Sequence, residues 1–288
     1  MSASTHNIKL KLAPLALLAV AASWGFAFLV MKDAIERQSV NSFLFSRFAL
    51  AVVVMVGLKP SILKRLDRDL IYKGGIAGFF LGSGYIFQTM GLARTGIAVT
   101  GFITGLYVIT APLLAAVFLK EKITKFTWFC VGLATFGLAL LSLNGWSIGA
   151  GEFFVLLSAF CFGAHIVSLS QWSNGRDAYA MTVVQLAACA LLSGIFSFAE
   201  GFQTPPDFGV WSVIIFTAII CTALAFIVQT WSQAHIAATK VAVILTMEVV
   251  FAAFFAILLY GERLTFKIAL GGAIVVAAMF LLVVKEKK

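Results

Sequence analysis

Residues 247–264 read MEVVFAAFFAILLYGERL, an apolar run with one carboxylate near its start and a charged turn at its end. A weaker copy, LYVITAPLLAAVFLKE, occupies residues 106–121. The two runs align at an offset of 141 positions, which places Tyr107 opposite Glu248 (248 − 107). Apolar runs of about this length cross a bilayer as helices. The chain therefore carries a duplicated membrane segment, and the duplication extends outward in both directions.

The two halves of the chain match along most of their length. The matches at an offset of 141 are Gln88-Thr89 with Gln229-Thr230, Glu121 with Glu262, and Thr124 with Thr265; nearer the start of each half, at an offset of 138, they are Trp24-Gly25 with Phe162-Gly163 and Arg47 with Gln185. Collinear matches of this kind indicate an internal repeat. We predict two domains, residues 1–145 and residues 146–288, each one copy of the repeat.

Composition places the chain in a bilayer, because 61% of its residues are hydrophobic and only 11% are charged. The apolar runs are continuous, as in helices, whereas the strands of a membrane barrel would show alternating segments of about ten residues. The sequence predicts an all-α membrane protein with ten transmembrane helices. The predicted spans are residues 12–31, 38–58, 74–93, 95–119, 126–143, 152–172, 178–199, 209–230, 241–260 and 268–284.

The odd number of helices in each copy makes the repeat inverted, since the second copy must enter the membrane from the opposite face. Inverted copies can pack in two nearly equivalent ways, one open to each side, which is the basis of alternating access. Fifteen Lys and Arg residues fall on the side of the termini and five on the other, with Arg47 inside a span. The positive-inside rule therefore places both termini in the cytoplasm. Because the net charge of +9 is spread over these short loops, it indicates topology and no nucleic-acid partner.

Several segments resemble the EamA branch of the drug/metabolite transporter superfamily. They are Ser23-Trp24-Gly25, Arg47-Phe48 and the two quoted runs at residues 106–121 and 247–264. The resemblance implies a multi-pass protein of the plasma membrane, the inner membrane in bacteria, with a mid-membrane cavity lined by both halves. It also implies export of small metabolites or amphipathic compounds. Members often have Glu-Pro in the ninth span, but here Val249 follows Glu248, so the sequence has no proline to kink the helix there; Pro112 can supply a kink in the fourth span.

Glu248 is the only carboxylate deep within a predicted span, since all five aspartates are predicted to lie in loops. In a helix of residues 240–260 it lies eight residues from the inner end, or about 12 Å. An ionisable group at this depth costs at least about 2.5 kcal/mol unless it faces a partner or a watery cavity. A carboxyl whose solvation alternates can load and release a proton. We expect Glu248 to bind substrate and couple protons; the alternative is a fixed polar tie between helices.

Two further side chains carry charge or protons within the spans. Arg47 is the only basic residue inside a span. It can snorkel toward the outer end of its helix, or it can turn inward to hold a substrate carboxylate or to pair with Glu248. His165, in the middle of the sixth span, can relay protons with Glu248 or can serve as a packing residue.

Trp24, Tyr85 and Tyr107 lie well inside spans, and each has a polar atom that needs a partner when buried. A cavity lined by these rings and Glu248 suits an amphipathic solute, amino-acid-like or an organic cation. We therefore expect a secondary active exporter driven by proton coupling, with no cofactor and no metal. A passive channel or facilitator is the main alternative, and an intramembrane enzyme is disfavoured because its clustered catalytic groups are missing. The expected partners are the substrate and the lipid bilayer, and a homodimer is left open.

Overall fold

The computed structural model describes residues 3–142, 149–261 and 263–285, and these residues form helices and loops without a strand. Within the described residues, nine helical segments are long and apolar enough to cross a membrane, and a shorter apolar helix at Lys125–Leu140 makes the tenth. The predicted all-α membrane fold of two inverted five-helix repeats is confirmed. Glu262 and the predicted domain boundary at residues 145 and 146 lie outside the described residues.

Seven spans are single helices and three are composite. The single helices are α1 (Ala3–Arg37), α2 (Val40–Leu58), α3 (Arg68–Leu92), α6 (Lys125–Ser142), α7 (Ala150–Trp172), α8 (Ala178–Ala199) and α13 (Phe266–Lys285). The fourth span is α4 (Ile97–Gly105), α5 (Tyr107–Leu114) and the π-helical turn η2 (Ala115–Leu119); the eighth is α9 (Phe208–Ala218), the π-helical turn η3 (Ile219–Leu224) and α10 (Ala225–Gln233); the ninth is α11 (Ala238–Leu245) and α12 (Met247–Tyr260). A 3-10 helix, η1 (Pro60–Arg65), joins α2 to α3.

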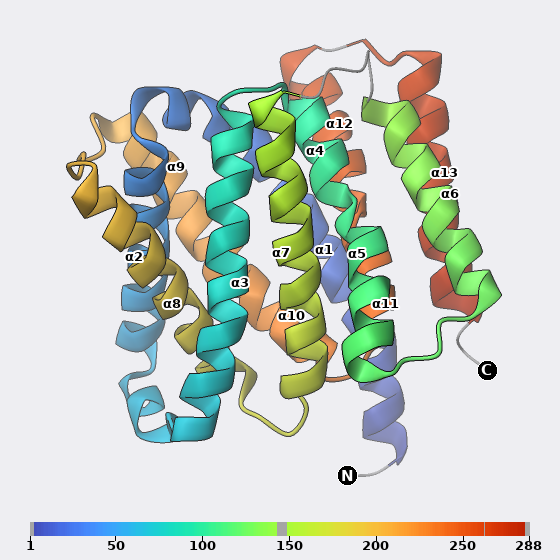
Figure 1. Cartoon of the computed structure of the whole chain (residues 1–288), viewed down its shortest axis with the longest axis horizontal. Helices are drawn as coiled ribbons and strands as arrows, with labels where there is room; N and C mark the ends of the chain where they lie inside the picture. Colours follow the sequence, from blue (N-terminus) through green and yellow to red (C-terminus); the bar gives the residue numbers. More distant parts are fainter. Residues whose placement is uncertain (1–2, 143–148, 262, 286–288) are drawn as a thin grey trace.

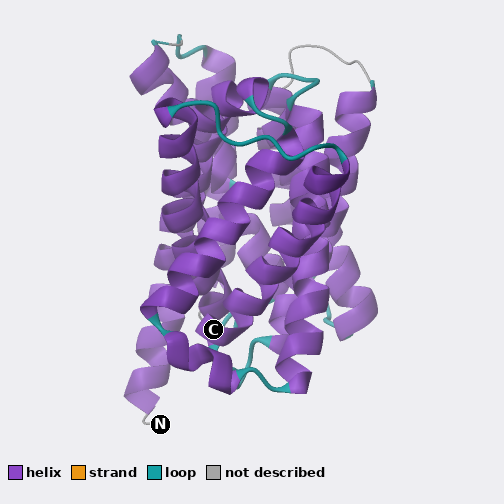
Figure 2. Ribbon diagram, turned by 90° about the vertical axis from the view of Figure 1, so that its left-hand side faces the viewer, coloured by secondary structure: helices purple, strands orange, loops and turns teal. Residues whose placement is uncertain are grey.

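The helices stand roughly side by side in one bundle (Figures 1 and 2). Helices α6 and α13 pack together at one edge, and α2, α8 and α9 lie at the opposite edge, with α1 between them (Figure 1). The start of α1 and the end of α13, as far as they are described, lie toward the same end of the bundle, as an even number of crossings requires (Figure 1).

Helices of the first half pack mainly against helices of the second. Helix α1 packs on α12, and its repeat counterpart α7 packs on α5. The contacts themselves are equivalent. A Cβ atom on Gly25 would lie 2.7 Å from the backbone nitrogen of Ala252, and one on Gly163 would lie 3.2 Å from that of Ala111. Only glycine permits such close backbone approach, which drives helix association in lipid. The two copies are therefore interlocked rather than separate bodies.

Helix α3 presents a glycine face to the second half. A Cβ atom on Gly78 would lie 2.5 Å from the carbonyl oxygen of Gln185, and one on Gly84 would lie 2.7 Å from the ring of Phe162. Glycine therefore permits close helix packing along α3, which contacts both α7 and α8.

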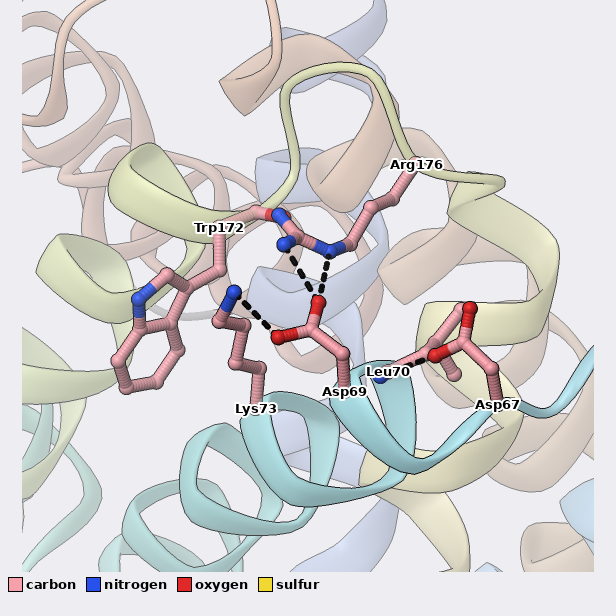
Figure 3. Close-up of polar contacts among 6 residues, drawn as sticks. All are labelled: Asp67, Asp69, Leu70, Lys73, Trp172 and Arg176. Atoms are coloured by element: carbon pink, nitrogen blue, oxygen red, sulfur yellow. Dashed lines mark hydrogen bonds and ion pairs between the residues drawn. The ribbon is translucent and has the colours of Figure 1, made fainter.

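Charged contacts join the two halves at the end of the bundle that holds the α2–α3 and α7–α8 loops. Asp69 accepts hydrogen bonds from Arg176, with 2.7 Å between Oδ2 and Nη2, and pairs with Lys73 at 2.6 Å (Figure 3). Asp69 lies in the first turn of α3, and Asp33 lies in α1, so the prediction that all aspartates occupy loops is wrong for these two. Both helices extend beyond their apolar spans, because polar end turns need no lipid contact.

Asp177 caps the start of α8 and accepts a hydrogen bond from Arg65 of η1, at 2.8 Å. Partial burial favours the neutral carboxyl, but the hydrogen bonds from Arg65 and from the N–H groups of Ala180 and Tyr179 outweigh it and lower the pKa of Asp177. On the other side of the bundle, Arg37 pairs with Asp207. Both ends of the interface between halves are therefore held by charged pairs in this conformation.

Candidate functional site

The fourth and ninth spans are each interrupted once near their middle. The breaks fall at Leu106 and Thr246, whose backbones have nearly the same angles (φ −64°, ψ −7° and φ −60°, ψ −16°). Hydrogen bonds of i to i+3 spacing occur at both breaks: the N–H of Ile109 donates to the carbonyl of Leu106, and the N–H of Val249 donates to the carbonyl of Thr246. Neither break contains proline, so the missing Glu-Pro does not remove the interruption. Pro112 instead precedes the π-helical turn η2, which begins at Ala115.

The residues just after these breaks meet each other. The Tyr107 hydroxyl donates to Oε1 of Glu248 across 3.4 Å, and both side chains are at least 96% buried. Positions related by an approximate two-fold axis can contact one another only close to that axis. Tyr107 and Glu248 are repeat equivalents, so their contact lies near the centre of the inverted repeat. Glu248 is also in the first turn of α12, where the helix dipole favours a carboxylate.

Arg47 turns inward and is 1% exposed. Its Nε donates to the hydroxyl of Thr222 at 2.6 Å, and Nη2 donates to the carbonyl of Cys221 at 3.4 Å. The guanidinium also lies 5.0 Å from the ring centre of Tyr85. Within the described part of the chain no ion pair joins Arg47 to Glu248. Arg47 does not snorkel, and it is held beside an aromatic ring where it can face a ligand.

His165 is held by an amide of the next span. Its Nε2 lies 2.8 Å from Oε1 of Gln185, while the Gln185 amide nitrogen donates to the carbonyl of Met181 at 3.1 Å. Because a carbonyl only accepts, this bond fixes the amide orientation and makes His165 Nε2 the donor. The other ring nitrogen, Nδ1, is left as an acceptor in the neutral imidazole.

Aromatic rings from both halves surround these polar side chains. Trp24 donates from Nε1 to the carbonyl of Cys221 at 2.8 Å, and its ring centre lies 5.4 Å from that of Phe226. Tyr85 makes edge contacts with Phe162 and Phe226 at 5.3 and 6.1 Å. Cys221 belongs to η3, and a π-helical turn interrupts regular backbone bonding, which helps to leave this carbonyl available to side chains of α1 and α2.

The side chains predicted from the sequence line one cavity of about 60 Å³. They are Trp24, Arg47, Tyr85, Tyr107, His165 and Glu248. Since a water molecule occupies about 30 Å³ and pockets for organic ligands span about 300 to 1,000 Å³, the cavity in this conformation has room for water but not for such a ligand. The bundle must open to admit a substrate of ordinary size.

Other lining residues were not singled out as site residues from the sequence. Phe162 and Gln229 line the cavity, and both had a signal in the repeat, because they match Trp24 and Gln88. Thr89 and Phe226 also line it. At the offset of 141 Phe226 matches Tyr85 (226 − 85), so the repeat carried a signal for it as well.

The family model for the EamA-like transporter family matches residues 11–143 and 149–284. The chain belongs to this family, within the drug/metabolite transporter superfamily. A protein of Archaeoglobus fulgidus named as an uncharacterized transporter is 33% identical over 261 residues, covering 90% of this chain and 82% of its own. A protein of Chlamydia trachomatis serovar L2 named as an S-adenosylmethionine/S-adenosylhomocysteine transporter is 27% identical over 269 residues, covering 83% and 79%.

A solved crystal structure shares this EamA transporter fold, with a TM-score of 0.78, 14% identity and coverage of 96% of this chain and 98% of that one. At this identity the likeness concerns the fold alone. The family model and the names of the two relatives make the EamA protein a multi-pass membrane transporter rather than an enzyme. Among its described residues, no group of three or more His, Cys, Asp or Glu side chains could hold a metal ion.

Proposed function

We propose that this EamA transporter is a secondary active exporter of small amphipathic metabolites, amino-acid-like or cationic, that works by alternating access with proton coupling. It acts in the plasma membrane, the inner membrane in bacteria, with both termini in the cytoplasm. Glu248 and His165 carry the proton, and Trp24, Arg47, Tyr85, Tyr107 and Glu248 bind the substrate.

The contact between Tyr107 and Glu248 is the observation that carries this proposal. It joins the two copies where their helices break, inside a cavity that also contains Arg47. An inward carboxyl there reaches water only when one side of the bundle opens, so its protonation can follow the direction of opening. One carboxyl and one guanidinium beside aromatic rings suit a substrate with both charge and apolar surface.

The relative named as an S-adenosylmethionine/S-adenosylhomocysteine transporter supports the substrate class, because those compounds combine an amino-acid group with an aromatic base. The cavity does not require that particular compound. A competition screen with amino acids, nucleosides and quaternary amines against one labelled solute identifies the class that this chain carries.

A passive facilitator is the alternative, and accumulation of solute against its gradient distinguishes an active transporter from a facilitator. Purified protein in vesicles is expected to concentrate a labelled solute when a proton gradient is imposed. This accumulation is expected to stop when a protonophore collapses the proton gradient. A facilitator would equilibrate the solute at the same rate with or without the gradient. Equilibration alone would overturn proton coupling and leave the family assignment intact.

A further inference from the structure

Arg47 buries a positive charge without a counter-ion. Its side chain is 1% exposed, and a guanidinium in a protein cannot become neutral by losing its proton. No carboxylate in the described part of the chain forms an ion pair with it. Glu248, the one acidic residue among the described residues that line the cavity, is hydrogen-bonded to Tyr107 instead. An unpaired buried charge is costly, so this guanidinium calls for a counter-ion from outside the chain.

The hydrogen bonds of Arg47 occupy one edge of the guanidinium. Nε and Nη2 donate to the hydroxyl of Thr222 and the carbonyl of Cys221, which are consecutive residues of η3, so η3 takes the edge that these two nitrogens share. Nη1 contacts the sulfur of Met31 at 3.3 Å, and a thioether is only a weak acceptor. At the edge between Nη1 and Nη2, a ligand therefore competes with nothing stronger than this sulfur contact in the described part of the chain.

The guanidinium lies in the wall of the cavity. Arg47 lines the cavity, and so do the three residues Trp24, Met31 and Tyr85. All three flank the guanidinium: Met31 contacts Nη1, the ring centre of Tyr85 lies 5.0 Å from Cζ, and the Trp24 indole donates to the same Cys221 carbonyl as Nη2. A ligand that enters between these side chains therefore meets the positive charge beside an aromatic surface.

We propose that Arg47 is a subsite for a carboxylate of the substrate, held by Nη1 and Nη2 together. A carboxylate is planar and has two oxygens and one charge, which match two parallel N–H groups and one positive charge. A phosphate group brings a charge of about −1.5 to −2, whereas Arg47 is the only Lys or Arg among the described residues that line the cavity. The inference rests on the proposed function for its setting, and it narrows the substrate class from amino-acid-like or cationic compounds to those that carry a carboxylate.

The test compares binding of 3-phenylpropanoate and of 3-phenylpropanamide, which have nearly the same shape and differ in charge, to the purified full-length protein. Ligand-induced thermal shifts over a concentration series, at constant ionic strength, measure the two affinities. We expect the carboxylate to bind at least about tenfold more tightly, as hydrogen bonds to a charged group predict. Arg47→Gln, which gives position 47 the amide of its repeat counterpart Gln185, is expected to bring this ratio to about one.

Two further variants complete the comparison. Arg47→Lys keeps the charge without the planar fork, so the ratio is expected to fall by about threefold, and this variant keeps the test valid if Arg47→Gln fails to fold. Arg94→Gln is the matched control and is expected to keep the wild-type ratio. Arg94 also donates to a backbone carbonyl, that of Met90, and lies 5.5 Å from the ring centre of Phe154, but it is exposed and is not among the residues that line the cavity.

Equal binding of the two probes to the wild type, binding of neither, or an unchanged ratio in both Arg47 variants would overturn the subsite. Chloride that stabilises the protein as much as 3-phenylpropanoate does at the same concentration would assign the guanidinium to an inorganic anion and would also overturn it. Vesicle transport is scored separately. Preference for the carboxylate without accumulation of any solute would retain the subsite and reject the proposed function, whereas accumulation without this preference would reject the subsite alone.

Discussion

The broken helix pair α4–α5 and its counterpart α11–α12 share a backbone and differ in chemistry. Both bend at one residue with nearly equal angles, and each packs on a glycine-containing helix of the other half. Just past the break, one has the phenol of Tyr107 and the other the carboxyl of Glu248. The duplication therefore supplies two equivalent hinge-like breaks but only one carboxyl, so in the proposed mechanism the two directions of opening share a single proton site.

The largest effect on transport is expected from removing the carboxyl of Glu248 alone. Glu248→Gln keeps the size and the acceptor for Tyr107 but has no titrating proton, so we expect the pH dependence of uptake to disappear while expression is unchanged. Glu36→Gln removes an exposed carboxylate of α1 and serves as the control. Initial uptake rates in vesicles at several pH values measure the effect. A Glu248→Gln protein with the wild-type pH profile would leave Glu248 a structural role only.

Exchanging Tyr107 and Glu248 tests whether the surroundings of the two positions are equivalent. Tyr107→Glu alone sets a second carboxyl against Glu248 at a buried contact, and we expect uptake to fall at least about tenfold, as coupled neighbours predict. The double variant Tyr107→Glu with Glu248→Tyr restores one acid and one phenol on opposite copies. It is expected to recover most of the lost uptake, measured in the same vesicles. No recovery would show that the surroundings of the two positions differ more than their backbones do.

The glycines that hold the two broken pairs are expected to differ in sensitivity. A Cβ atom on Gly25 would lie 2.5 Å from the backbone carbonyl oxygen of Glu248, whereas the nearest atom to one on Gly163 is the movable Oγ1 of Thr110, at 2.3 Å. Gly25→Ala is therefore expected to lower the free energy of unfolding by about 1–3 kcal/mol, and Gly163→Ala by less. Thermal unfolding in detergent ranks the two, with Gly57→Ala, where nothing lies near the added atom, as the control. The reverse ranking would contradict the contact geometry.

The smallest expected effect concerns the bond between the copies. Tyr107→Phe removes a hydroxyl whose 3.4 Å contact with Glu248 is long, so we expect uptake to change by only about two- to fivefold. The pH of half-maximal uptake is expected to move while the dependence itself persists. A loss as complete as that of Glu248→Gln would make Tyr107 part of the proton path.

The fold could be predicted from the sequence because bilayer crossing depends on local properties. Apolar run length and charge placement are readable residue by residue, and the ten predicted spans correspond to nine long helical segments and the shorter helix at Lys125–Leu140, within the described residues. The repeat offset also predicted that Tyr107 and Glu248 occupy equivalent positions. The break at Thr246 could not be predicted, because no proline or glycine lies beside it, whereas at the other break Gly105 directly precedes Leu106.

The sequence by itself determined that the chain lies in a lipid bilayer, how many times it crosses, that its two halves are an inverted duplication, and which residues are candidates for the cavity. Each of these follows from composition or from self-similarity. Only the tertiary structure decided that Arg47 turns inward and that Tyr107 meets Glu248. These features depend on which atoms of one half lie opposite which atoms of the other. A hydrogen bond needs its two atoms within about 3.5 Å, and no sequence pattern specifies distances between helices at that precision.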